Sequence, residues 1–460
     1  MRIKQWGLTY GVVLIFIFAI INANLAQASQ TEEKTMLNTP TTLLSNYHFP
    51  EIHHWTTQKG VNVYFIQSTA LPMLDIEVIF DAGSIRNGHQ EGLSALTNAL
   101  LAEGTARFSA DELHEQFEAV GAEFESDARK EMALVRLRTL TKPAYLEQAL
   151  STFIEVTAKP SFEQGAFERE RNNALIALEN ENQNPARVAG KAFYQLIYGE
   201  HPYGAPVLGT KESLLGLTRE SIIDFYKTYY VAQNATIAMV GDITLAKAQS
   251  IAEELSAPLN EGKAPPSLDA VKQTSGKIER IDFPSEQTHI LMGMPGLKRI
   301  DNDYFPLVVG NHILGSNGTI NRLFQILRNQ HGLAYSANSY FLPMHEQGPY
   351  ILSVQTKKES ADKALALLNQ TFNDFLEKGP SEEELELAKA NLLGGYALRF
   401  DSNEALLTHL AMIGFYKLPL DYNETYPLKV NEVSTKDIQA AFKKRFSTQQ
   451  LFTVMVGPNS

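Results

Sequence analysis

The sequence has no cysteine among its 460 residues. This absence excludes a disulfide framework, a lipid-modified N-terminal cysteine and a thiol nucleophile. Basic residues are also few, because 40 Lys and Arg stand against 52 Asp and Glu, which gives a formal charge of −12. Nucleic acids and anionic membranes are bound by clustered Lys and Arg, so we expect neither as a partner. A chain of this length can form two or more domains whose cores need no metal or crosslink.

The N-terminus carries a nearly uninterrupted apolar run over residues 7–21, preceded by Arg2 and Lys4. Ala26-Gln-Ala28 then fits the small-x-small cleavage pattern. We interpret residues 1–28 as a secretory signal that is cleaved after Ala28 and leaves no membrane anchor. An uncleaved anchor is the alternative, although the run is shorter than the ~20 residues of a typical membrane span. Export without cysteine suits a bacterial periplasm, which is the expected location.

Three patterns recur at a separation of about 215 residues, which favours a duplicated domain over a short-period repeat. The apolar segment that ends at Gly241 matches the segment that ends at Gly457. The stretch 74–80 matches 288–294. Two amphipathic helical stretches each contain a Pro-Ser pair, at 160–161 and 380–381, that is typical of a helix start.

Within each copy, alternating apolar strands are mixed with helical stretches that have apolar residues three and four apart. The sequence therefore predicts an α+β protein with two homologous lobes, each a mostly antiparallel sheet with helices packed on one face. We place the N-terminal domain at residues 29–256 and the C-terminal domain at 278–460. Residues 257–277, rich in Pro and Gly, are the predicted linker.

No self-contained hydrolytic chemistry is visible in the residues. The sequence has no G-x-S-x-G motif, so a nucleophile elbow is excluded. The histidine candidates for a metal site are the adjacent pair His53 and His54, His89 with Glu91, and His114 with Glu118. Adjacent residues face opposite ways, and a single pair is too few ligands, so we interpret these histidines as solvated or hydrogen-bonded.

Three short motifs bracket one predicted helix: Asp-Ala-Gly-Ser at 81–84, Glu-Gly-Leu at 91–93 and Glu-Gly-Thr at 103–105. They resemble the insulinase (pitrilysin) family of zinc peptidases, whose helix carries HxxEH at this point. In that motif two histidines bind zinc and the glutamate is the general base. The matching positions here are Ala95, Asn98 and Ala99, which can play neither role.

The family's third zinc ligand is a glutamate about 75 residues further on, before a turn that ends in proline. Counting back from Pro185 places Ala177 at that position. Glu179 and Glu181 are nearby acids, which we interpret as surface residues at the helix end. The resemblance thus implies a degenerate zinc site, and we expect no metal in this chain.

A second family motif is present in the C-terminal copy. The Gly-rich loop 314–318 is followed by the helical stretch 321–328 and then by Gly-Leu-Ala-Tyr-Ser at 332–336. In relatives of this kind, an arginine and a tyrosine seven residues apart hold the substrate peptide opposite the zinc helix. The resemblance assigns this role to Arg328 and Tyr335. The segment 201–210 resembles a structural loop of the family, so His201 is interpreted as a loop residue.

The resemblance implies a division of labour between two chains. We expect this chain to be inactive alone and to be the non-metal-binding subunit of a heterodimeric zinc metallopeptidase. A homologous partner would carry Zn²⁺, and this chain would complete the chamber for peptide substrates. The acidity of the chain would favour basic or neutral peptides. The alternatives are a periplasmic peptide-binding or chaperone-like protein without peptidase activity, and a structural subunit, which the signal sequence disfavours.

Overall fold

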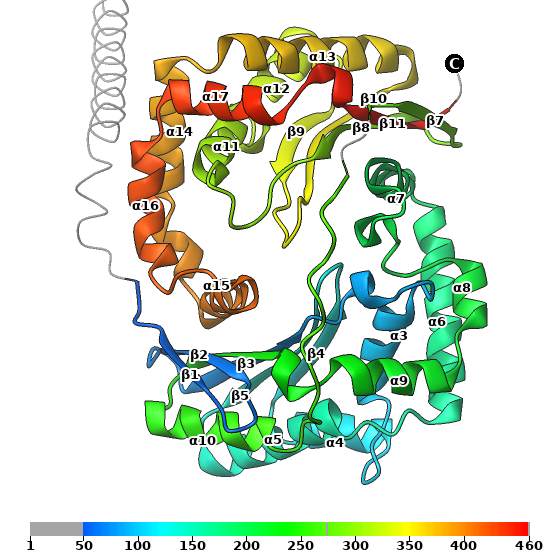
Figure 1. Cartoon of the computed structure of the whole chain (residues 1–460), viewed down its shortest axis with the longest axis vertical. Coiled ribbons are helices and arrows are strands. Elements are labelled where there is room, and N and C mark those ends of the chain that lie inside the picture. The colour runs from blue at the N-terminus through cyan, green and yellow to red at the C-terminus, as the bar shows by residue number, and fades with distance from the viewer. Residues whose placement is uncertain (1–48, 273–274, 459–460) are drawn as a thin grey trace, which may run out of the picture.

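The computed structural model describes residues 49–272 and 275–458. The predicted signal sequence lies outside the described residues. Within them, no helix combines the length and the apolar character needed to cross a membrane. The elements keep the labels of Figure 1, which shows the N-terminal half of the chain below and the C-terminal half above.

The first sheet has six strands in the order β1-β2-β6-β3-β5-β4. Only the β2–β6 pairing is parallel, and the other neighbours are antiparallel. Runs of consecutive buried residues in β2 and β3 show that both faces of these strands are covered, because neighbouring side chains point to opposite faces. The bounds are β1 (His53–Thr56), β2 (Asn62–Gln67), β3 (Met73–Phe80), β4 (Glu123–Ala128), β5 (Ala133–Leu140) and β6 (Ala235–Gly241).

The second sheet repeats this topology in the order β7-β11-β8-β10-β9. Here the β7–β11 pairing is parallel and the rest are antiparallel. The two predicted strand matches hold, because β6 corresponds to β11 and β3 to β8. The duplication predicted from the sequence is therefore confirmed. The bounds are β7 (Ile278–Asp282), β8 (Gln287–Pro295), β9 (Ser336–Phe341), β10 (Pro349–Lys357) and β11 (Phe452–Gly457).

Several helices of the N-terminal half begin at a side-chain cap. Ser109 forms a capping box with Glu112 at the start of α4. The helices are α3 (Leu93–Ala99), α4 (Ala110–Glu118), α5 (Pro143–Ala158), α6 (Gln164–Asn182), α7 (Pro185–Tyr198), α8 (Lys211–Gly216), α9 (Arg219–Tyr229) and α10 (Leu245–Ser256).

Of the two Pro-Ser pairs predicted to start a helix, the one in the C-terminal half does so. Ser381 caps α14 as expected, whereas α6 begins three residues after Ser161, with Glu163 at its N-cap. The reason is that Pro160 is held in a β-bridge with Thr105 before the helix begins. The helices are α11 (Tyr304–Asn311), α12 (Arg322–Phe324), α13 (Ala361–Lys378), α14 (Glu382–Gly394), α15 (Asn403–Tyr416), α16 (Tyr422–Glu432) and α17 (Thr435–Arg445).

The two halves exchange a helix. Helix α15 of the C-terminal half lies across β6, β3 and β2 of the first sheet, and α7 of the N-terminal half lies across β11 and β8 of the second (Figure 1). Gly414 of α15 brings its backbone close to the ring of Tyr64, and Phe193 of α7 packs beside Gly293 of β8. Each sheet thus carries helices of its own half on one face, as predicted, and a helix of the other half on the opposite face.

The alternation of side chains along the strands fits this arrangement. In β2, Val63 and Phe65 join the core formed with the helices of the N-terminal half. Their neighbours Tyr64 and Ile66 point the other way and join a core that continues into the second sheet. One continuous apolar core therefore spans both halves of the chain.

The segment predicted to be a linker follows the N-terminal half as far as it is described. Asn260 forms a bridge with Val231, and Pro266 accepts a hydrogen bond from Arg86. Val271 is buried. The predicted domain boundaries themselves stay a prediction.

Candidate functional site

Helix α3 is the element on which the family resemblance places the zinc ligands. It begins after Gly92, whose backbone is left-handed at φ 88°. A Cβ on Gly92 would lie 2.8 Å from the carbonyl oxygen of Leu208, and one on Gly209 would lie 2.6 Å from the carbonyl oxygen of Glu91. The Glu-Gly-Leu motif and the loop 201–210 therefore pack against each other, and both glycines are needed for this close approach.

The three positions that the resemblance assigns to the zinc motif all lie in α3. Ala95 is half-buried and Ala99 is exposed, and each offers only a methyl group. Asn98 is buried, and its Nδ2 donates to the carbonyl oxygens of Asp127 (2.5 Å) and Leu134 (3.3 Å). Asp127 in β4 and Leu134 in β5 are cross-strand partners, so the amide at the general-base position fastens the helix to the sheet.

Ala177, the position expected for the third ligand, is exposed on α6. Glu179 is exposed and Glu181 half-buried, close to the C-terminal end of the same helix. In the described part of the chain, no group of three or more His, Asp or Glu side chains could hold a metal ion. Methyl groups and a committed amide donor do not fit zinc, which requires imidazole, thiolate or carboxylate ligands. We therefore derive no zinc chemistry from this chain.

The other histidine candidates have ordinary surroundings. His53 and His54 stack on Phe65 and Tyr64, and His114 pairs with Glu118 one helical turn away (3.0 Å). His201 lies in the loop 201–210 as predicted. Its Nδ1 accepts from the backbone of Tyr203, and its Nε2 lies 3.0 Å from the carbonyl oxygen of Asp269.

Arg328 and Tyr335 lie side by side. The Arg328 guanidinium donates to the carbonyl oxygen of Tyr335 (3.0 Å) and stacks over the ring of Phe324. Arg328 is exposed, and the Tyr335 side chain is 47% exposed. A cavity of about 850 Å³ lies between the two lobes, and neither Arg328 nor Tyr335 lines it. The structure thus brings the pair together on the surface, and their role toward a peptide stays a prediction.

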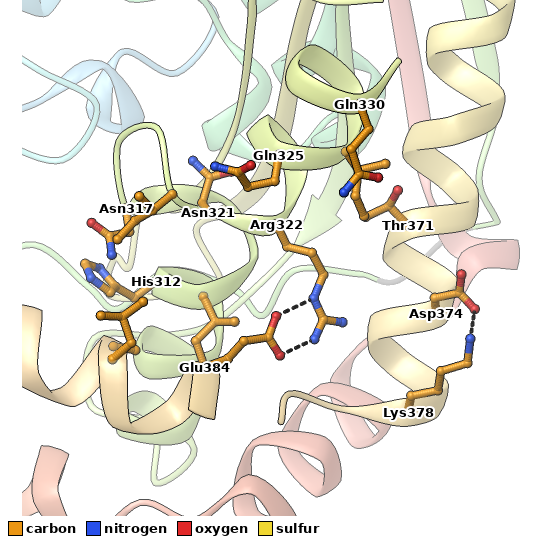
Figure 2. Close-up of a pocket in the computed structure, with 15 residues that line it drawn as sticks. His312, Asn317, Asn321, Arg322, Gln325, Gln330, Thr371, Asp374, Lys378 and Glu384 are labelled. Atoms are coloured by element: carbon orange, nitrogen blue, oxygen red, sulfur yellow. Dashed lines mark hydrogen bonds and ion pairs between the residues drawn. The ribbon is translucent and has the colours of Figure 1, made fainter. Parts of the chain in front are cut away.

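The Gly-rich loop before this pair has a packing role. A Cβ on Gly315 would lie within 2.4 Å of the backbone nitrogen of Ser339 in β9, so only glycine allows this contact. A neighbouring cavity has a volume of about 430 Å³. Figure 2 shows that Arg322, in its lining, points toward Glu384. Two hydrogen bonds, of 2.9 and 2.5 Å, join the two side chains and fasten α12 to α14.

A larger cavity of about 850 Å³ lies between the lobes. Its lining comes from both halves of the chain, including β3, the turn between β4 and β5, β9, and helices α7, α11, α15 and α16. Tyrosines contribute much of the surface: Tyr194, Tyr304, Tyr340, Tyr416 and Tyr426. A concave site of this size, with aromatic walls and several charged side chains between them, is suited to ligand binding.

Glu131, in the turn between β4 and β5, joins the two halves beside this cavity. Its buried carboxylate accepts hydrogen bonds from the hydroxyl groups of Tyr203 (2.5 Å) and Tyr416 (2.8 Å), and from the backbone nitrogen of His345 (3.0 Å). Burial raises the pKa of Glu131, but the hydrogen bonds and charge of His345 and the two tyrosine donors lower it more, so the net pKa lies below its usual value.

The cavity is cationic although the chain is acidic. Five cationic side chains line it (Arg129, Lys130, Arg136, Arg299 and Arg399) against the two carboxylates of Glu77 and Glu131. Burial lowers the pKa of Lys130 to about 8. The expectation that a negative chamber favours basic peptides is therefore wrong for this cavity, because the acidic residues that set the net charge lie mostly elsewhere.

Sequence analysis missed Glu131, Arg299 and Arg399. No motif distinguishes them, since Glu131 has the same local pattern as a solvated glutamate in a turn. Their proximity depends on the helix exchange, which no local signal indicates.

Comparison with known proteins identifies the family. Residues 63–211 match the model of the insulinase family, peptidase family M16, and residues 216–392 match that of the peptidase M16 inactive domain. A crystal structure of a peptidase M16 inactive domain from Pseudomonas fluorescens is 34% identical, with a TM-score of 0.86, and the match covers 89% of this chain and 98% of that one.

Two further relatives extend the comparison. A protein from Helicobacter pylori called non-peptidase homolog YmxG is 27% identical, over 88% of this chain and 93% of its own length. A protein from Rickettsia felis called a zinc protease is 24% identical, over 90% of this chain and 98% of its own. Taken with the duplicated two-lobe fold, these matches show that the chain belongs to the insulinase family of peptidases, family M16.

Proposed function

We propose that this chain is a non-catalytic member of family M16 that binds peptides and completes the active chamber of a zinc-bearing homologue. The observation that carries the proposal is Asn98. At the position of the general base it donates to two sheet carbonyls, and alanines flank it where the family has its histidines. The relatives named as an inactive domain and as a non-peptidase homolog support the same reading.

In the proposed heterodimer, the partner's zinc supplies the activated water. This chain contributes binding and orientation of the peptide. Arg328 and Tyr335 are suited to this role, because a guanidinium and a phenol donate hydrogen bonds to peptide carbonyl groups. Their exposure leaves both side chains accessible to a second protein.

The test is reconstitution. We expect the purified chain to cleave no peptide with or without added zinc, and cleavage to appear when a zinc-bearing homologue from the same organism is added. Cleavage by this chain alone that a chelator abolishes would contradict the proposal. If no zinc-bearing homologue from the same organism bound this chain, or if none cleaved peptides together with it, the proposed heterodimer would be contradicted.

The role of the pair is tested separately. Arg328→Ala and Tyr335→Phe should lower turnover of the reconstituted enzyme about tenfold or more while leaving assembly intact. Arg187→Ala, at an exposed position of α7, is the matched control and should be neutral. Full turnover in both variants would show that Arg328 and Tyr335 have no such role.

A second function is favoured by the cavity itself. Because both lobes of one chain line it, peptide binding requires no partner. A peptide-binding or chaperone-like protein would bind peptides in isolation, and no homologue would convert this binding into cleavage.

We also propose that the protein acts in the periplasm. The support is the N-terminal pattern over residues 1–28, which lies outside the described residues. Protein recovered from a periplasmic fraction should begin at Ser29, and a mature chain that retains Met1 would contradict signal cleavage.

A further inference from the structure

Two arginines in the cavity between the lobes have no carboxylate partner in the part of the chain that the structure describes. Among the described residues, neither Arg299 nor Arg399 has an acidic side chain at ion-pair distance, and the acids near Arg299 are already engaged. Lys298 binds Glu346, and Arg445 binds Asp301 (2.8 Å) and Asp303 (3.0 Å). The carboxylate of Glu131 is held by Tyr203, Tyr416 and His345.

Both guanidinium groups are positioned by tyrosine rings. Arg299 lies 5.2 Å from the ring centre of Tyr416, and its terminal nitrogen is 3.4 Å from the Tyr304 hydroxyl. Arg399 lies 5.9 Å from the ring centre of Tyr426. Stacking on aromatic faces fixes a guanidinium but leaves its in-plane N–H donors available. The Nε atom of Arg299 is buried and has no hydrogen-bond partner among the described residues.

His409 of α15 lines the same cavity as the two arginines. Burial, followed by the charges of Arg399 and Arg299, lowers the pKa of His409 to about 4, so this side chain is neutral near pH 7. The histidine therefore adds no charge of its own, and the positive potential of the two guanidinium groups is left without a counter-ion from the described residues.

We propose that Arg299 and Arg399 form a carboxylate-binding site in the cavity, and that this site selects acidic peptides. Arginine binds a carboxylate through two parallel hydrogen bonds. Arg299 is half-buried, which strengthens such bonds, whereas Arg399 is exposed. The tyrosine walls would hold the apolar part of the peptide. That the ligand is a peptide rests on the proposed function, whereas the anion site rests only on the cavity.

The carboxylate could be the C-terminus of the peptide or the side chain of an Asp or Glu. Four N-acetylated pentapeptides of otherwise identical sequence separate these sources. They carry either Glu or Gln at the centre and either a free carboxylate or an amide at the C-terminus. A fifth peptide carries Lys at the centre and an amide at the C-terminus. Binding to the isolated chain is measured by isothermal titration calorimetry.

We expect at least one carboxylate-bearing peptide to bind about tenfold or more tightly than the neutral peptide, as for a charge-assisted hydrogen bond. In Arg299→Gln and Arg399→Gln this preference should fall to about threefold or less, and Arg299→Lys should keep part of it. Arg187→Gln, which removes an exposed charge outside the cavity, should leave the preference unchanged.

Equal binding of acidic and neutral peptides by the unmodified chain, or tighter binding of the Lys peptide, would overturn the proposal without any variant. A preference that survives in both glutamine variants would also overturn it. If cleavage by the reconstituted enzyme occurs without acid preference, the proposed function stands and the carboxylate site fails. If the isolated chain prefers acidic peptides but no homologue restores cleavage, the carboxylate site stands and the proposed role in a heterodimeric peptidase fails.

Discussion

The contacts that Asn98 makes from α3 are structural in this chain. Asn98 stands where the family resemblance expects the general base, and its amide group can donate two hydrogen bonds at once, which a carboxylate cannot. The two carbonyl groups that it contacts belong to a cross-strand pair of β4 and β5. This position therefore contributes to stability where the active family has chemistry.

Replacing Asn98 should destabilise the fold. We expect Asn98→Ala to lower the free energy of unfolding by about 1–3 kcal/mol, because two carbonyl groups lose a donor inside the protein. Asn98→Asp should cost more, since a carboxylate would face the same oxygen atoms without a donor. Urea unfolding followed by circular dichroism measures both, with the exposed Asn329→Ala as a neutral control. Unchanged stability in Asn98→Asp would refute this role.

His409 makes stability depend on pH. Burial, Arg399 and Arg299 lower its pKa to about 4 in the folded state, from an ordinary value of 6.5. Between these values the unfolded chain binds a proton that the folded chain does not. Stability should therefore fall as the pH drops from about 6.5 toward about 4. His409→Gln should show a smaller loss between about pH 7.5 and about pH 5. The same loss in both proteins would assign the effect to other groups.

At the scale of elements, the exchanged helices α7 and α15 decide which faces of the sheets are covered. Their sequences begin alike, each with a polar N-cap, Asn184 and Ser402. Each also contains a glycine, but the two glycines have different surroundings. A Cβ on Gly414 would lie 2.8 Å from the Tyr64 ring and from Thr236, whereas one on Gly190 would have no atom within 4 Å.

This difference predicts opposite effects of one substitution. Gly190→Ala should stabilise the protein by about 0.5–1 kcal/mol, because alanine favours the helix and meets no obstacle. Gly414→Ala should destabilise it by about 1–3 kcal/mol, because α15 would have to move away from the sheet. Thermal unfolding of the two variants measures the contrast. Stabilisation by Gly414→Ala would show that α15 does not pack tightly on β2 and β6.

At the scale of the whole molecule, the exchange makes each half depend on the other. Without α15, the face of the first sheet that carries Tyr64, Ile66 and Ile79 would be exposed to water. Without the second sheet, α7 would have no partner for Phe193. The two lobes are homologous, but their cores are shared.

We therefore expect that residues 49–256 and 278–458, produced separately, do not fold into native lobes. Near-ultraviolet circular dichroism should show no fixed aromatic environment in either piece, and gel filtration should show expanded or aggregated species. Producing both pieces together should restore a compact complex. A sharp, independent unfolding transition in the first piece would contradict this expectation and support autonomous domains.

Glu131 is the polar counterpart of the shared core. We expect Glu131→Gln to lower the free energy of unfolding by about 1.5–3 kcal/mol, because two tyrosine hydroxyls and the His345 nitrogen lose a charged acceptor. The pKa of Glu131 is lowered in the folded state, so its contribution is present above the unfolded pKa and fades as the pH falls through the folded value. The stability of the variant should therefore approach that of the original protein at acid pH. An equally large difference in unfolding free energy at neutral and acid pH would contradict a lowered pKa of Glu131 in the folded state.

Local patterns in the sequence were sufficient for the elements and for the repeat. Apolar patterns placed the strands β3, β6, β8 and β11, and the Pro-Ser pair at 380–381 marked the start of α14, because each depends on neighbours within one segment. The strand matches at Gly241 and Gly457 identified the duplication for the same reason. The prediction at Pro160-Ser161 was three residues early, because a bridge to a distant strand-like segment holds the chain there.

The sequence by itself determined the strand and helix pattern, the two homologous lobes and the replacement of the zinc-motif residues on α3, since these are properties of short stretches. Only the tertiary structure decided which helix covers which sheet and that Glu131, Arg299 and Arg399 line one cationic cavity. Net charge is a sum over the chain, whereas a cavity is charged by the few side chains that the fold brings to it. Contacts between residues more than a hundred positions apart leave no local pattern, and this is the physical reason that the cavity could not be derived from the sequence.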